Sequence, residues 1–459
     1  MGECVTRRKW IVKFLTWERL ILISLICTAF LYRAFPHFIV YRWLPCEEEY
    51  NYLTVEELLE TGTTHLIGFY PLLTHYLIYI LVLLTHIDPV ILCQYFNPFI
   101  GALSIIPLYF IAKQFFSTKQ SLIICMIWSF SEASFYRTAY FGTTEPFAFM
   151  LCLISQYFYI KKRYVPSIIF LAVSFYSHLL PGFHTVIVYG IDLLMKGTKK
   201  QKISILFLLT ILILFFFSPL NPHQRAIEAI KFVKLNPFIY NLNDIMLGLN
   251  VFSGLMVLFI FSILSFFKQR THSFWCSSLH ASILFFAGSW LTYNPYFYGA
   301  PRMTFYFVVP LSFFAIHTIK NHHVIIIGII LSSLLATLNG LQPMLWIGDA
   351  MTENEYKALD DLEKLNVNFT SSLWFTDYPV NIAITRKGKT IQTIQLSKRN
   401  ETVIKYVFLS ERNMRNGLFI ERKSSRNLIV HKPIQDIWKN SSDWILIYNK
   451  YGVKIYERK

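Results

Sequence analysis

The chain has 459 residues, of which 54% are hydrophobic, 17% aromatic and only 15% charged. Soluble domains carry about 25% charged residues, so this composition excludes an ordinary soluble protein and predicts an integral membrane protein. The formal net charge is +16. Many of the basic residues stand in short loops between apolar segments, as topology signals do, so we expect no nucleic-acid partner.

Eleven apolar segments are candidates for membrane-spanning helices, each of which needs about 20 residues. They cover roughly residues 20–35, 90–112, 120–135, 143–160, 164–179, 181–195, 203–219, 246–267, 274–291, 304–319 and 322–343. A twelfth segment, 66–85, contains His75 and is predicted not to span, since counting it would move every later lysine cluster to the opposite side. It is interpreted as a re-entrant or interfacial helix.

Basic residues recur at every second loop of this scheme. They are Arg7, Arg8, Lys9, Lys13, Lys113, Lys119, Lys161 to Arg163, Lys196 to Lys202, Lys268, Arg270 and Lys320. Loops rich in Lys and Arg face the cytosol. We therefore expect a multi-pass protein whose N-terminus is cytosolic and whose C-terminal region is extracytosolic, with the first span serving as targeting signal.

The segment 345–459 is charged, rich in predicted strands and long enough for its own core. Thr352 and Glu355 have the spacing of a capping box that opens a helix, and 444–448 and 453–456 alternate around a turn, as in a hairpin. We predict a transmembrane domain over 1–344, with a first outer loop at 36–89, and a small extracytosolic α/β domain over 345–459.

Two further patterns describe the chemistry of the compartment. Glycosylation acceptor triplets occur at Asn368, Asn400 and Asn440, all in the C-terminal segment, where they give weak support for an extracytosolic location. The seven cysteines lie mostly in or beside apolar segments and predict no disulfide framework. The sequence contains no Cys/His spacing of metal type, phosphate-binding glycine loop or nucleophile elbow.

Ionisable residues gather in three predicted outer loops. Loop 36–65 contains the run Glu47 to Glu49, loop 136–145 contains Arg137 and Glu145, and loop 292–303 contains Arg302. Carboxylates can hold a metal or act as a base, and guanidinium groups neutralise phosphate. Together these loops predict a site for an anionic donor.

Structural roles remain open for each of these residues. The Glu run can be a solvated helix start, and Glu145, which precedes Pro146, can complement a helix N-terminus or pair with Arg137. Arg302 can extend toward the interface from an apolar span. His178 and His184 flank Pro181 and Gly182 at another predicted outer loop, and a packed or interfacial role is favoured over catalysis for both.

The run Cys46 to Tyr52, which reads CEEEYNY, resembles the first acidic motif of the catalytic subunit of oligosaccharyltransferase, in the GT-C class of membrane glycosyltransferases that use polyprenyl-linked donors. Glu47 stands at the position of the family's Asp. Phe69 to Pro71 and His86 to Asp88 match the family layout, and the resemblance runs over nearly the whole chain. It implies a GT-C-like bundle and supports the non-spanning interpretation of 66–85.

The stretch from Ser134 to Glu145 resembles the family's second motif, with Glu145 at its second acid and Thr143 in place of the first. That replacement removes an expected metal ligand. Arg302 is similar to the arginine that contacts the donor phosphate. Glu228 is placed at the family's outer-loop glutamate, although the pattern around it is absent.

The run Leu373 to Pro379, which reads LWFTDYP, is similar to the family's acceptor motif but has an extra residue and ends in Pro. By this resemblance Trp374, Asp377 and Tyr378 bind the acceptor. A strand followed by a turn would explain the same residues without a functional role.

The resemblance implies an enzyme that transfers a sugar or oligosaccharide from a polyprenyl-(pyro)phosphate donor to an acceptor, which can be a protein asparagine, on the extracytosolic face. Membrane lipids are further expected partners. The implied catalytic residues are Glu47, Glu48 and Glu145, and the implied donor-binding residues are Arg137, Arg302 and Glu228. Glu47 and Glu145 are candidate ligands for Mg²⁺ or Mn²⁺, with a metal-free reaction through Glu47 or Glu48 as the alternative.

Other functions stay open at this point. A GT-C transferase that adds single sugars to a glycan or lipid is favoured if acceptor-sequence recognition is lost. A lipid-glycan transporter would place its charged residues near the bilayer centre, often within repeats, and neither pattern is visible in the sequence. A non-catalytic homologue is consistent with Thr143.

Overall fold

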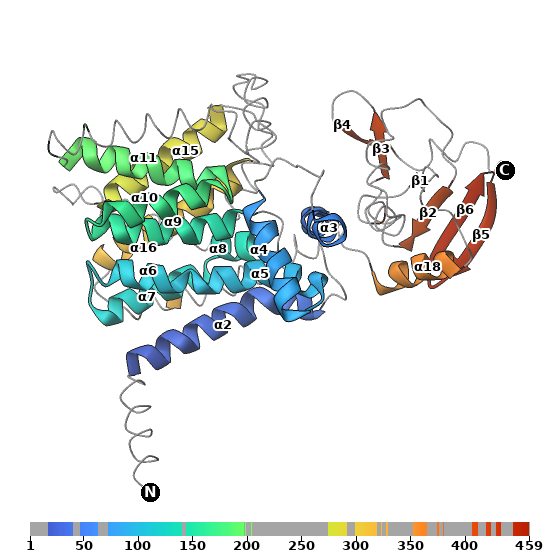
Figure 1. Cartoon of the computed structure of the whole chain (residues 1–459), viewed down its shortest axis with the longest axis horizontal. Coiled ribbons are helices and arrows are strands. Elements are labelled where there is room, and N and C mark those ends of the chain that lie inside the picture. Colours follow the sequence, from blue (N-terminus) through green and yellow to red (C-terminus); the bar gives the residue numbers. More distant parts are fainter. Residues whose placement is uncertain are drawn as a thin grey trace, which may run out of the picture.

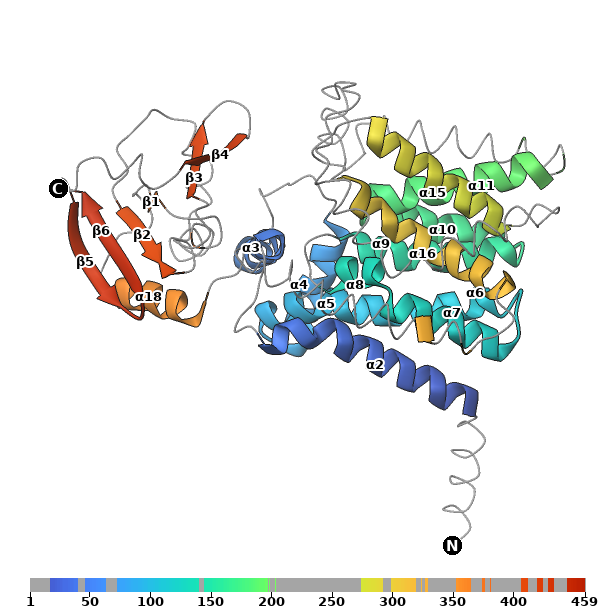
Figure 2. The ribbon, with the colours of Figure 1, turned by 180° about the vertical axis from the view of Figure 1, so that it is seen from behind.

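The structure, a computed structural model, describes residues 17–39, 46–62, 72–139, 144–196, 198, 203, 274–291, 299–318, 323, 327–328, 352–364, 374–375, 380, 406–411, 419–423, 428–432 and 444–458. Among these residues, the chain forms an apolar helical bundle and a C-terminal region of helix and sheet (Figure 1). Figure 2 shows the same two parts from behind, with α3 (Cys46–Thr61) between them.

The bundle contains helices at most of the predicted spans. They are α2 (Trp17–Ile39), α5 (Pro89–Leu103), α6 (Ile105–Ala112), α7 (Thr118–Phe130), α8 (Glu132–Thr138), α9 (Glu145–Ile160), α10 (Tyr164–Phe175), α11 (Leu179–Lys196), α15 (Phe274–Leu291) and α16 (Gly299–Thr318). By length and composition, 17–38, 89–112 and 179–196 qualify as membrane spans among the described residues. The predicted segments 203–219, 246–267 and 322–343 lie almost wholly outside the described residues, so the count of eleven stays a prediction.

Local sequence rules explain where several helices begin and end. Ser117 caps α7 in a capping box with Gln120, and α7 ends where Ser131 becomes extended, at φ −72° and ψ 137°. Helix α8 starts at the next residue. Helix α9 opens with Glu145 and has Pro146 in its first turn, where a missing N–H has no cost. The breaks on either side of α8 separate it from the longer helices.

The core of the bundle is aromatic and joins helices that are distant in sequence. Trp128 of α7 stacks on Phe149 of α9 with ring centroids 5.2 Å apart, and Phe149 lies 4.5 Å from Phe305 of α16. Such ring pairs contribute about 0.5–1.5 kcal/mol beyond their buried area. These ring pairs join α7, α9 and α16 in the core of the bundle.

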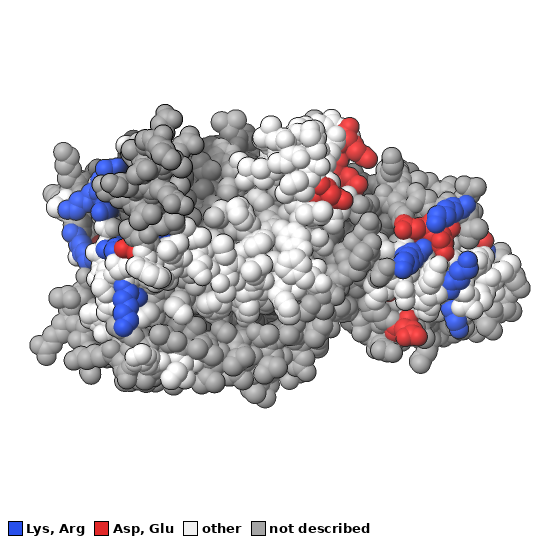
Figure 3. Space-filling model, turned by 90° about the horizontal axis from the view of Figure 1, so that it is seen from below, with Lys and Arg blue, Asp and Glu red and all other residues white. Residues whose placement is uncertain are grey.

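One end of the bundle, the basic end, carries the loop lysines. Lys113 at the end of α6 lies 3.4 Å from Glu18 at the start of α2, and Lys196 at the end of α11 lies 3.2 Å from Asp192, which also accepts from Tyr159 near the end of α9. Figure 3 shows Lys and Arg of the bundle gathered at this end, and Asp and Glu farther along the molecule. Lys113 and Lys196 therefore lie at one end of the bundle, while the alternation of the loops and the membrane side that each faces stay predictions.

Helices α3 and α4 (Leu73–Thr85) pack beside α5 rather than extending the bundle. Tyr52 and Val55 of α3 are buried in a cluster with Ile78 of α4 and with Cys93 and Phe96 of α5. Helix α4 has 13 residues, about 20 Å at 1.5 Å per residue, which is less than the bilayer core of about 30 Å. Because α7 and α10, at predicted spans, have only 13 and 12 residues, this length does not distinguish α4 from a span, and its non-spanning placement stays a prediction.

The C-terminal region contains α18 (Glu353–Lys364) and two sheets. The strands are β1 (Trp374–Phe375), β2 (Tyr406–Ser410), β3 (Phe419–Lys423), β4 (Leu428–Lys432), β5 (Trp444–Lys450) and β6 (Val453–Arg458). One sheet has the order β1-β2-β6-β5, with β1 parallel to β2 and the other pairs antiparallel, and β3 pairs with β4 in the second. The described part thus confirms the predicted mixture of helix and strand.

Two local predictions are confirmed in this region. The Thr352 backbone N–H donates to Glu355 at 2.6 Å and the Glu355 N–H donates to the Thr352 hydroxyl at 3.3 Å, so the capping box forms. Strands β5 and β6 are joined through Tyr451 and Gly452, both with positive φ (55° and 73°), which suits a tight hairpin turn.

Helix α18 is fastened to the four-stranded sheet by apolar and polar contacts. Leu359 and Leu362 are fully buried against Phe408 and Ile455. The Tyr448 hydroxyl of β5 donates to Asp361 at 3.1 Å. Burial, and then this hydrogen bond and the Asp361 charge, raise the pKa of Tyr448 above its ordinary value, so the hydroxyl remains a donor.

Candidate functional site

Arg137 and Glu145 meet at the end of the bundle opposite the basic end, which we call the site end. Arg137 lies in the last turn of α8 and Glu145 is the first residue of α9. Arg137 Nη1 is 4.0 Å from Glu145 Oε2, with the side chains 9% and 0% exposed. Two residues from the same predicted loop therefore form a buried ion pair, one of the alternatives that the sequence left open.

Glu145 has a second partner from a distant helix. The Tyr306 hydroxyl of α16 donates to Glu145 Oε1 at 2.5 Å. A short bond to a carboxylate is typical of a charge-assisted hydrogen bond, which is roughly twice as strong as a neutral one. Each carboxylate oxygen of Glu145 therefore has its own partner, one cationic and one neutral.

His184 of α11 supports Tyr306 from the side. Its ring lies 4.7 Å from the Tyr306 ring, and its Nε2 is 3.0 Å from the hydroxyl of Ser282 in α15. Ser282 in turn donates to the Tyr306 carbonyl at 3.0 Å. At the same end, the Leu180 N–H donates to His178 Nδ1 at 3.2 Å. Both histidines are packed into the fold, the role that the sequence favours for them.

The residue before Glu145 is fixed to two other elements. The Thr144 hydroxyl donates to the Ser177 carbonyl at 2.5 Å, and the Ser177 hydroxyl donates back to the Thr144 carbonyl at 3.2 Å. Ser177 also shares a 2.7 Å hydrogen bond with Thr74 of α4. These bonds hold the start of α9 against the end of α10 and the start of α4.

The acidic run of the first motif lies in the first turn of α3, at residues 47–49. The described residues give its backbone but not these side chains. Helix α3 contacts α4 and α5, and Figure 1 places it at the site end of the bundle, beside these two helices. The motif therefore lies on the same side of the bundle as Arg137 and Glu145.

The other predicted site residues are placed only in part. Arg302 is in α16, four residues before Tyr306, about one helical turn from a residue that contacts Glu145; its side chain is outside the described residues. Trp374 is in β1, paired with Tyr406, and its contact with an acceptor stays a prediction. The remaining residues that the sequence analysis singled out fall outside the described residues, namely Thr143, Glu228, Asp377 and Tyr378.

Glu145 is one of the two candidate metal ligands that the sequence gives. Among the described residues, no group of three or more His, Cys, Asp or Glu side chains could hold an ion. A guanidinium 4.0 Å from the carboxylate would repel a second cation. The described contacts of Glu145 are those of an ion pair, and a metal shared with Glu47 stays a prediction.

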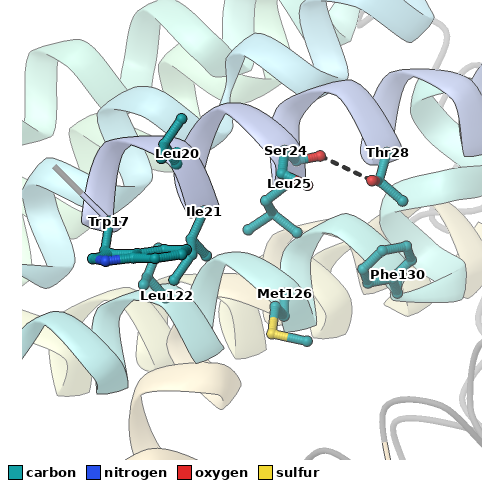
Figure 4. A pocket seen from close by; sticks show the side chains of 9 residues that line it. All are labelled: Trp17, Leu20, Ile21, Ser24, Leu25, Thr28, Leu122, Met126 and Phe130. Atoms are coloured by element: carbon teal, nitrogen blue, oxygen red, sulfur yellow. Dashed lines mark hydrogen bonds between the residues drawn. The ribbon is translucent and has the colours of Figure 1, made fainter. Parts of the chain in front are cut away.

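A hollow between α2 and α7 lies toward the basic end (Figure 4). It has a volume of about 460 Å³ and is lined mostly by apolar side chains, among them Trp17, Leu25 and Phe130. Its polar hydroxyl at Thr28 donates to the Ser24 carbonyl at 2.8 Å. An apolar wall of this kind suits contact with lipid chains and offers no group for chemistry.

Sequence reasoning missed two residues at the site end, Tyr306 and Arg33. Arg33 is fully buried in α2, within the predicted span 20–35. A signal existed for it, because a lone ionisable residue inside a membrane span is a functional candidate by default. No comparable signal marks Tyr306, since tyrosine is common near membrane interfaces.

Comparison of the chain with protein-family models and with curated proteins gave no match. Among solved structures, the chain is similar to the crystal structure of the Archaeoglobus fulgidus oligosaccharyltransferase in the apo form, with 13% identity and a TM-score of 0.45. The match covers 84% of this chain and 58% of that one.

Proposed function

We propose that the chain is a membrane glycosyltransferase that transfers a sugar or oligosaccharide from a polyprenyl-(pyro)phosphate donor to an acceptor on the extracytosolic face. One observation carries the proposal. The acidic helix α3 and the Arg137–Glu145 pair come from two predicted outer loops, and both lie at the end of the bundle opposite the lysine-rich loops. Motif resemblance to oligosaccharyltransferase implies the reaction class.

The reaction needs an acid–base group for the acceptor and a positive charge for the leaving phosphate. Glu47, with Glu48 beside it, is proposed to orient or deprotonate the acceptor nucleophile, which attacks the sugar carbon as the bond to phosphate breaks. Arg137 and Arg302 are proposed to stabilise the phosphate that leaves. Glu145, together with Tyr306, holds Arg137 in place.

The other predicted site residues and the predicted metal extend this proposal. Glu228 is a further proposed donor-binding residue, and Trp374, Asp377 and Tyr378 are proposed to contact the acceptor. A divalent ion shared by Glu47 and Glu145 is kept as a proposal for the chelator experiment below, and no step is derived through it. The position of α3 and of the Arg137–Glu145 pair at one end of the bundle, away from its middle, favours this proposal over a transporter, whose site would lie near the bilayer centre.

The test measures transfer in membranes that contain wild type, Glu47→Gln or Glu60→Gln, supplied with native lipid-linked glycans and an acceptor-triplet peptide. Glu60 is exposed on the same helix as Glu47, so it is a matched control for the loss of one carboxylate. We expect Glu47→Gln to lower peptide glycosylation by about 10²–10⁴-fold, the usual contribution of an acid–base group, and Glu60→Gln to leave it unchanged.

The other outcomes separate the alternatives. Consumption of the donor without a glycosylated peptide would indicate a different acceptor, such as a glycan or lipid that receives single sugars. No consumption in wild-type membranes would reject the enzyme and leave the transporter or the non-catalytic homologue. Loss of activity with a chelator would support the divalent ion.

A further inference from the structure

Arg33 satisfies all of its donors with neutral groups. Its side chain is 0% exposed, and a guanidinium has five N–H donors. The acceptors are Thr138 Oγ1 at 2.6 Å, Ser134 Oγ at 2.7 Å, and the carbonyls of Ser129 at 2.9 Å, Ala29 at 3.1 Å and Trp128 at 3.2 Å. Each of these bonds uses one of the five hydrogens, and none goes to a carboxylate.

Four of these acceptors belong to the end of α7 and to α8. Trp128 and Ser129 are in the last turn of α7, where carbonyls lack partners within the helix and the helix dipole is negative. Ser134 and Thr138 are four residues apart on α8, and so lie on one face of that helix. A single guanidinium therefore caps α7 and binds one face of α8.

A second side chain of α2 binds the C-terminal end of α8. His37, one turn after Arg33, has Nε2 2.8 Å from the carbonyl of Ala139, the residue that ends α8. Helix α8 has seven residues, far fewer than the roughly 12–15 that an isolated helix needs for marginal stability. Helix α8 therefore depends on its neighbours, which are α5, α7, α9 and α16 in addition to these two side chains of α2.

Helix α5 packs closely against the contact between Arg33 and Thr138. A Cβ added at Gly101 of α5 would lie 2.5 Å from Thr138 Cβ and 2.9 Å from Arg33 Nε. The Trp128 indole N–H donates to the Gly101 carbonyl at 3.2 Å. Helices α2, α5, α7 and α8 thus meet at the guanidinium, and α8 cannot shift without breaking several of these contacts.

We propose that Arg33 is a positioning residue that holds α8 in register, so that Arg137 stays paired with Glu145. Arg137 directly precedes Thr138, the residue that accepts the Arg33 Nε bond at 2.6 Å. A rotation or slide of α8 would carry the Arg137 guanidinium away from the carboxylate. The consequence for the donor phosphate rests on the function proposed above, whereas the anchoring of α8 does not.

The first test is hydrogen exchange of the α8 amides in the full chain in detergent. Arg33→Lys keeps the charge but loses the planar fork of five donors, and Arg19→Lys is the matched control at the exposed start of the same helix. We expect exchange in 132–138 to rise at least tenfold in Arg33→Lys, with α9 unchanged and no change in Arg19→Lys. If α8 exchange stays at the wild-type rate, the proposal is wrong.

The second test separates anchoring from a direct role with the donor. If Arg33 acts through Arg137, Arg33→Lys raises the KM for the lipid-linked donor about tenfold with little change in kcat, and has no further effect in an Arg137→Lys background. Effects that multiply in the double variant would overturn the link. Should Arg33→Lys fail to fold, Thr138→Val, which removes one acceptor at nearly constant shape, replaces it in both tests.

The two tests fail in different ways. Fast α8 exchange with no transfer by any variant, wild type included, would reject the proposed enzyme while keeping the anchor. Normal α8 exchange would reject the anchor whatever the activity.

Discussion

The two buried arginines at the site end, Arg137 and Arg33, have different kinds of partner. Arg137 faces the Glu145 carboxylate, so the local charge is compensated. Arg33 faces only carbonyl and hydroxyl dipoles. Removal of one member of a buried pair leaves the other uncompensated, at a cost of about 3–5 kcal/mol, whereas removal of both often costs little.

This difference leads to a prediction for the pair. Arg137→Met should destabilise the protein by ~3–5 kcal/mol, because Glu145 would be left buried without its cationic partner, and the double variant Arg137→Met/Glu145→Gln should recover most of that loss. Unfolding in detergent, followed by thermal or denaturant titration, measures the cycle. Lys119→Met, on the exposed start of α7, is the control that should be near neutral. Strictly additive single effects would show that the two side chains do not interact.

At the scale of elements, the short helix α8 depends on its neighbours for its placement. The extended conformation of Ser131 separates α8 from α7, and the described contacts then tie it to α2 and α5. Close approach between helices is possible because Gly101 has no side chain at the contact, a use of small residues that is common in membrane bundles.

Two glycines give a matched pair of predictions at this scale. Gly101→Ala places a methyl group 2.5 Å from Thr138 Cβ and should destabilise the protein by ~1–3 kcal/mol, as overpacking does. Gly190→Ala, in α11, meets nothing within 4 Å and should be neutral or stabilise by up to ~1 kcal/mol through helix propensity. Thermal unfolding of both variants in the same detergent is the measurement. Equal stability of the two variants would contradict the tight contact at Gly101.

At the scale of the whole molecule, the bundle has two chemically different ends. Lysines and their partners Glu18 and Asp192 are at the basic end, and the Arg137–Glu145 pair is at the site end. Since loops rich in Lys and Arg remain cytosolic, the site end is predicted to be extracytosolic.

Cysteine labelling in intact cells tests this orientation. A thiol reagent that cannot cross membranes should label a Glu60→Cys variant, on the exposed face of α3, without permeabilisation. It should label Lys119→Cys, in the first turn of α7, only after the membrane is opened. The parental chain supplies the background from Cys27, which is exposed on α2. Labelling of both variants from the same side would contradict the predicted topology.

Local patterns in the sequence were sufficient for much of the fold. Apolar runs predict helices that the structure contains at 89–112 and 179–196. The capping box at Thr352 and the turn at Gly452 also form as predicted. Each of these features depends on residues that are close in sequence, so short-range rules of burial, capping and turn geometry determine them.

The candidate site depends on local sequence and on helix packing. The sequence shows that Arg137 and Glu145 are ionisable residues beside apolar segments. Only the tertiary structure decided that they pair, that Tyr306, 161 residues away from Glu145, binds the same carboxylate, and that Arg33 bonds to Thr138 across 105 residues. The physical reason is that a buried polar group must find a partner wherever helix packing brings one within hydrogen-bond distance, and that packing is set by contacts between helices far apart in the chain.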